Sequence, residues 1–196
     1  MGWMASWVAV QGADKAALLE AVGLEETAER VEPGSRRRPF SLGELPDGWL
    51  VVFSEDFEWG SPKRAIELSR HGRTISLQFE DKSEMTAIAC EAVRGAQVWR
   101  VAHDAADAEL EVEGTPPSVL ASIRQEFERL QSGDDSVDYL HEIPIELAKA
   151  VCGYRADEWE PSFAALRRAG AAQSPGHPAV EGGGLGGFLK RLFGLA

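Results

Sequence analysis

The sequence has few of the features that usually reveal a function. It holds two cysteines in 196 residues, Cys90 and Cys152, which gives no disulfide framework and fits a reducing compartment. No apolar run approaches the roughly 18 residues that cross a bilayer, and residues 1–10 lack the basic start of a signal peptide. These absences predict a cytoplasmic protein.

The sequence also has few basic residues. Lys and Arg number 20 against 32 Asp and Glu, so the net charge is −12. Nucleic-acid binders need clustered Lys and Arg to contact phosphates, and the cluster that the chain has, Arg36 to Arg38, lies in a polar segment typical of a solvated turn. The charge balance therefore excludes a general nucleic-acid binder and favours a basic protein partner.

Catalytic and cofactor motifs are missing as well. Residues 182–187 formally satisfy G-x-G-x-x-G, but the dinucleotide motif needs a preceding strand and a βαβ unit, and this segment is typical of a linker. His141 begins like a zinc-protease motif, but Ile145 stands where the second histidine belongs. Neither a phosphate-binding loop nor a nucleophile-elbow serine is present. No cofactor is predicted.

The middle of the chain carries a run of strand patterns. Residues 74–79 and 98–103 alternate apolar and polar side chains, and residues 85–93 are almost continuously apolar. Gly95 marks a tight turn between two of these strands. Leu110 and Val112 alternate with glutamates, which is typical of a charged edge strand. The pattern predicts a central antiparallel meander.

The flanking segments predict further strands and several helices. Strands are expected over residues 3–10 and 49–53, and a polar loop over 25–47 with Phe40 and Leu42 as its anchors. Capping residues, prolines and glycines delimit helices over residues 14–23, 61–72, 115–133, 144–153 and 161–170. This order predicts an α+β fold with a mainly antiparallel sheet and helices packed largely on one face.

The composition changes near the C-terminus. We expect a single domain over residues 1–168, a flexible Gly/Ala/Pro/Ser linker over 169–187 and a short amphipathic tail helix over 188–196. The tail would place four apolar residues on one face, opposite Lys190 and Arg191: these are Phe188, Leu189, Leu192 and Phe193. Three roles stay open for it: docking in a partner groove, weak contact with a membrane surface, or covering its own domain.

An acidic loop with two aromatic residues follows the strand at residues 49–53. Glu55, Asp56 and Glu58 interleave with Phe57 and Trp59. Aromatic anchors inside a charged rim suit a basic protein partner. In the alternative interpretation, the two aromatic side chains fold back onto the core while the carboxylates face water.

A second hypothesis concerns two histidines. His103 and Asp104 end a predicted strand, and His141 lies near Asp138 before a predicted helix. Strand ends and loops often carry functional side chains, so His103, Asp104 and His141 are candidates for a metal or acid–base site. In the alternative interpretation, His103 packs beside Trp99 as a structural residue.

Two stretches carry a resemblance. Residues 98–104, Val-Trp-Arg-Val-Ala-His-Asp, and residues 138–148 with 153–155, Asp-Tyr-Leu-His-Glu-Ile-Pro-Ile-Glu-Leu-Ala and Gly-Tyr-Arg, resemble segments in a group of small uncharacterised bacterial proteins. The resemblance implies a bacterial cytosolic origin and brings no activity.

The preferred interpretation is a non-enzymatic interaction module with an acidic surface, for which an immunity- or antitoxin-like role fits. The alternative is a small-molecule or metal-binding protein, or an enzyme, with a site near the two histidines.

Overall fold

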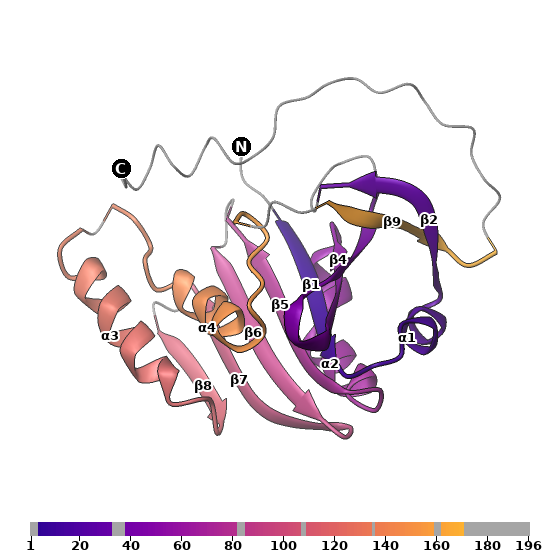
Figure 1. Ribbon diagram of the computed structural model, residues 1–196. Helices are drawn as coiled ribbons and strands as arrows, with labels where there is room; N and C mark the ends of the chain where they lie inside the picture. Colours follow the sequence, from indigo (N-terminus) through magenta and orange to yellow (C-terminus); the bar gives the residue numbers. More distant parts are fainter. Residues whose placement is uncertain are drawn as a thin grey trace.

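The computed structural model (Figure 1) describes residues 4–32, 38–81, 85–106, 109–134, 136–158 and 162–170. Within these ranges the chain forms one nine-stranded antiparallel sheet with four α-helices and two short 3-10 helices. The strands are β1 (Met4–Gln11), β2 (Leu24–Val31), β3 (Phe40–Glu44), β4 (Trp49–Ser54), β5 (Arg73–Glu80), β6 (Thr86–Val93), β7 (Ala96–Asp104), β8 (Leu110–Gly114) and β9 (Phe163–Arg168). The helices are α1 (Lys15–Val22), η1 (Pro46–Gly48), η2 (Phe57–Gly60), α2 (Pro62–Leu68), α3 (Val119–Gln131) and α4 (Glu142–Cys152). The predicted α+β class and antiparallel sheet are confirmed.

The strands follow the order β2-β9-β3-β4-β1-β5-β6-β7-β8. Strands β5 to β8 are sequential neighbours, so the predicted meander forms one half of the sheet. Between β6 and β7, Arg94 and Gly95 both have positive φ, 53° and 82°, as the tightest hairpin turns require. The predicted edge strand β8 does end the sheet.

The other half of the sheet differs from the prediction. Strands β2 and β3 occupy much of the expected loop over residues 25–47, so that prediction was wrong. β2 is an edge strand in which only Leu24 and Val31 are buried, and its polar sequence therefore resembles a loop. The expected anchors Phe40 and Leu42 are buried, but within β3.

β9 replaces the helix expected over residues 161–170. It lies between β2 and β3 and pairs with both, as Figure 1 shows for β9 beside β2. Ala164 and Ala165 favour helices intrinsically, but two neighbouring strands supply hydrogen-bond partners that a helix would not use. Three other helices differ in their boundaries from the prediction: α2 ends at Leu68 rather than near residue 72, α3 begins at Val119 rather than near residue 115, and α4 begins at Glu142 rather than Pro144.

Helices cover both faces of the sheet, which corrects the expectation that they lie largely on one. Trp7 and Trp99 share the larger core with Ile143 and Leu147 of α4, and α3 packs against the same cluster. Val8 of β1 faces the opposite side and shares a second core with residues of α1 and α2. In Figure 1, α4 lies in front of the strands and α2 behind them. Because β1 is apolar on both faces, each face needs a cover.

The predictions for residues 171–196 lie outside the described residues. The last two described residues still pair with the body, because Ala169 N donates to Gly23 O at 2.9 Å and Gly170 N to a Glu25 carboxylate oxygen at 3.3 Å. In the part of the chain that the structure describes, no helix combines the length and apolar character needed to cross a membrane.

Candidate functional site

One row of side chains crosses the sheet on the face that carries α2. Strand register places these residues side by side in the order Ser6, Gln78, Ile88, Ala102 and Glu111. Adjacent strands lie about 4.8 Å apart, so four spacings carry the row about 19 Å from β1 to β8. The row links two acidic features that are far apart in the sequence.

The loop of residues 55–60 is attached at the β1 end of this row. Ser6 Oγ donates to Asp56 O at 2.6 Å and accepts from Gly60 N at 2.9 Å, while Gln78 Nε2 donates to Phe57 O at 2.9 Å. Ser6 and Gln78 are both buried. The predicted interaction loop is therefore held against the sheet by its backbone.

Within the loop, the aromatic and acidic side chains differ in exposure. Asp56 and Glu58 are exposed, and Asp56 Oδ1 accepts from Glu58 N at 3.0 Å. Trp59 is half-buried against Phe40, with ring centroids 5.5 Å apart, and Arg64 lies 5.4 Å from its ring. Glu55 and Phe57 are also half-buried. Trp59 thus follows the alternative interpretation, and the two exposed carboxylates are compatible with both interpretations.

An open groove of about 360 Å³ lies at the β8 end of the row, lined by Ile88, Arg100, Ala102, His103, Asp104, Glu109 and Glu111. Its three carboxylates and one guanidinium give a net charge of −2. Arg100 Nη1 already contacts Glu111 at 2.8 Å and Glu113 at 3.1 Å, so its charge is shared between two carboxylates. The groove is suited to a cationic group.

Strand alternation explains why these carboxylates gather on one face. The register pairs Ala102 with Glu111 and Arg100 with Glu113, while Val101 and Val112 form a pair on the other face. We use the term acidic surface for six residues: Asp56, Glu58, Asp104, Glu109, Glu111 and Glu113. Ile88 and Ala102 lie in the row between its two ends.

The candidate site at His103, Asp104 and His141 is divided between the two faces. His103 Nε2 donates to Asp138 Oδ2 at 2.8 Å, on the side of Trp99 and the larger core. The other oxygen of Asp138 accepts from the backbone N of Leu140 at 3.1 Å and of His141 at 3.4 Å. The structure therefore brings both histidines to Asp138, whereas Asp104 lines the groove on the α2 face.

Burial makes this cluster poorly suited to catalysis. The His103 side chain is 1% exposed. Burial lowers the pKa of His141, although Glu142, Asp138 and a backbone hydrogen bond with Thr86 oppose that shift. Among the described residues, no three His, Cys, Asp or Glu side chains are placed to hold a metal ion. The cluster fastens the connection between α3 and α4 to β7.

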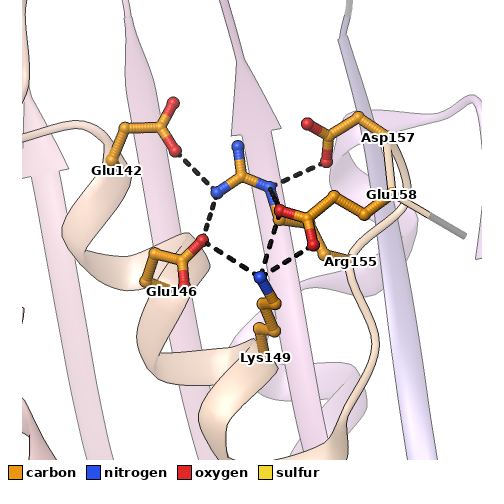
Figure 2. Close-up of polar contacts among 6 residues, drawn as sticks. All are labelled: Glu142, Glu146, Lys149, Arg155, Asp157 and Glu158. Carbon is orange, nitrogen blue, oxygen red and sulfur yellow. Dashed lines mark hydrogen bonds and ion pairs between the residues drawn. The ribbon is translucent and has the colours of Figure 1, made fainter. Parts of the chain in front are cut away.

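A third polar group, shown in Figure 2, joins α4 to the turn before β9. The Arg155 side chain is 12% exposed. It lies between two carboxylates of α4, Glu142 and Glu146, and two carboxylates of the turn, Asp157 and Glu158. Its Nη1 is 2.9 Å from Glu142, and its Nε is 2.8 Å from Asp157. Burial lowers the pKa of Arg155, but the surrounding carboxylates raise it by a larger amount, so the net shift is upward.

The sequence contains a signal for part of this network. Glu142, Glu146 and Lys149 recur at intervals of four and three residues, which places them on one face of a helix. Lys149 Nζ lies 2.8 Å from Glu158, so the helix and the turn are joined by a second cation. The group is internally paired and serves to hold the chain as it leaves α4.

The cysteines do not provide a nucleophile. Burial raises the pKa of Cys90 to about 12 and that of Cys152 to about 12, so both thiols stay protonated at neutral pH. Both side chains are buried, as expected for small apolar residues.

Comparisons with protein-family models, with curated proteins and with solved structures give no match for this chain. The resemblance of residues 98–104 and 138–155 to bacterial proteins stays a prediction.

Proposed function

We propose that this protein is a non-enzymatic bacterial interaction module that binds a basic partner through its acidic surface. The observation that carries the proposal is the shared row across the sheet. It places Asp56 and Glu58 on the same face as Asp104 and the glutamates of β8. Two acidic segments that the sequence separates by about fifty residues thus lie on one face of the sheet.

The charge of the whole chain supports the same partner chemistry. A net charge of −12 attracts a basic protein at long range, and the acidic surface supplies the local complement that fixes orientation. Phe57 and Trp59 add half-buried aromatic area beside exposed carboxylates, which resembles the composition of interface anchors and their rim. An immunity- or antitoxin-like role is one form that such a module takes.

The proposal is tested by charge reversal at each end of the surface. Two double variants, Asp56→Lys with Glu58→Lys and Glu109→Lys with Glu111→Lys, are compared with a control that reverses two exposed carboxylates elsewhere, Glu20→Lys with Glu126→Lys. Affinity capture from the source cell at low salt, followed by mass spectrometry, identifies the retained proteins.

We expect a basic protein that binds the wild type and the control, and whose binding each surface variant weakens by about tenfold or more, because several charge pairs are lost. Its binding also falls as salt rises. A set of bound proteins that is the same for all variants would overturn the proposal.

A further inference from the structure

We infer that β8 accepts an extended basic segment of the partner protein as an additional antiparallel strand. The inference rests on the proposed function and specifies how the partner is held. β8 ends the sheet, and β7 is its only strand partner among the described residues. Within the described part of the chain its residues 111–114 are all exposed.

The backbone of β8 leaves hydrogen-bonding groups on its outer side. Thr115 N donates to Val98 O at 3.1 Å next to the pair of Trp99 and Gly114. In an antiparallel ladder, hydrogen-bonded and non-hydrogen-bonded pairs alternate, so Glu111 and Glu113 direct their backbone groups toward β7. Val112 then directs its N–H and C=O outward, where an incoming strand can bind them.

The side chains of β8 define the sequence that this strand should have. Glu111 and Glu113 lie on the α2 face about 6.8 Å apart, and directly opposite residues of a neighbouring strand come within about 5 Å. An incoming strand with Lys or Arg at every second position therefore places one cation beside each glutamate. Leu110 and Val112 lie on the other face, so its intervening residues should be apolar.

The charge pattern also argues against two other segments as the strand that pairs with β8. A second copy of this chain would place glutamates against glutamates, which destabilises strand pairing. The C-terminal tail has its two cations at adjacent positions, Lys190 and Arg191, which a strand would direct to opposite faces. A partner segment with alternating basic and apolar residues fits both faces of β8.

The test uses a fluorescent synthetic peptide that alternates lysine and valine, and a second peptide of the same sequence with N-methyl groups on the valine backbone nitrogens, which face Val112 in the proposed pairing. N-methylation preserves charge but removes the donors that strand addition needs. Binding to the full-length protein is measured by fluorescence anisotropy. We expect the methylated peptide to bind at least about tenfold more weakly.

A variant of the protein tests the same hydrogen bonds by removing the donor on β8. Val112→Pro removes the outward N–H and is compatible with an edge strand, whereas Val112→Thr keeps that donor. We expect only the proline variant to lose about tenfold in affinity for the unmethylated peptide. Circular dichroism checks that both variants fold, and if the proline variant does not, the methylated peptide decides.

The outcomes separate the inference from the proposed function. Equal binding of both peptides, reduced by Glu109→Lys with Glu111→Lys, overturns strand addition and leaves the acidic surface as the binding site. Binding that appears only after deletion of residues 171–196 assigns the edge to the tail. Dimerisation that is lost in the proline variant assigns it to a second copy. Either of these last two results overturns the inference.

Discussion

Gly43 of β3 leaves the space that the Phe163 side chain of β9 occupies. A Cβ at this position would lie 2.1 Å from Cε1 of Phe163, well inside van der Waals contact. The Phe163 ring stacks on Tyr154 with centroids 5.6 Å apart, and Tyr154 meets the edge of Trp7 at 5.2 Å. The absence of a side chain at Gly43 thus allows an aromatic cluster that joins the two ends of the described chain.

Replacing Gly43 should therefore destabilise the fold. We expect Gly43→Ala to lower the free energy of unfolding by about 1–3 kcal/mol, because the extra methyl group overpacks the Phe163 ring. Urea denaturation followed by tryptophan fluorescence measures the change. Gly133→Ala is the control, since its nearest contact would be an ordinary 3.5 Å. Equal stability of Gly43→Ala and the wild type would show that the ring moves without cost.

Glu91 has hydrogen-bond partners that the sequence around it does not indicate. In the sequence it is one polar residue in an apolar strand. In the structure its side chain is 8% exposed, and its two oxygens accept from Arg73 Nε and Trp99 Nε1, both at 2.6 Å. Its partners lie on the two neighbouring strands, so its role depends on strand register rather than on the pattern around it.

At the scale of elements, His141 links the pH dependence of stability to the connection between α3 and α4. Its pKa lies below the ordinary 6.5 in the folded protein, chiefly because of burial. The groups around it are Asp138, Glu142, His103 and the Thr86 backbone. Below pH 6.5 the His141 side chain binds a proton more readily in the unfolded chain than in the folded protein. The contribution of His141 to the free energy of unfolding is therefore complete above pH 6.5 and is lost as the pH falls.

We therefore expect the free energy of unfolding to fall as the pH is lowered from about 7.5 to about 5, and His141→Gln to reduce the slope. Urea denaturation at a series of pH values measures both. His71→Gln is the matched control, because His71 is exposed and its removal should leave the slope unchanged. An identical slope in His141→Gln and the wild type would assign the pH dependence to other groups.

Most elements could be predicted because their side chains alternate or their ends carry capping residues. Asp14 accepts from Ala17 N and Gly23 takes a left-handed conformation, as expected for the ends of α1. β2 was missed because an edge strand needs little apolar sequence, and β9 because its alanines suit a helix. The acidic loop and the glutamates of β8 were recognised singly, but their common row depends on register across five strands.

At the scale of the whole molecule, the sheet is completed by a strand from the far end of the described chain. β9 pairs with β2 and β3, and β2 has β9 as its only strand partner among the described residues. Phe163 and Leu166 are both 1% exposed and belong to the cores on opposite faces. Each contributes about 1.5–3 kcal/mol of burial, a large part of the 5–15 kcal/mol that stabilises a typical domain.

Two truncations should therefore behave very differently. A chain of residues 1–170 keeps β9, and we expect its melting temperature to match that of the full chain within a few degrees. A chain of residues 1–161 exposes the cores beneath Phe163 and Leu166 and leaves β2 unpaired, so we expect it to lose cooperative thermal unfolding by circular dichroism. Cooperative unfolding of the shorter chain would show that the rest of the sheet folds without β9.

The 1–170 chain also separates the roles of the body and the tail. Residues 171–196 carry Glu181, Lys190 and Arg191, a net charge of +1, so the remaining chain carries −13 and keeps the whole acidic surface. If that surface binds the basic partner, the truncated chain should retain the interaction, with affinity equal to or slightly above that of the full chain because a competing positive charge is gone. Titration of both chains with the captured partner at one salt concentration measures this, and loss of binding in the truncated chain would place the contact in the tail.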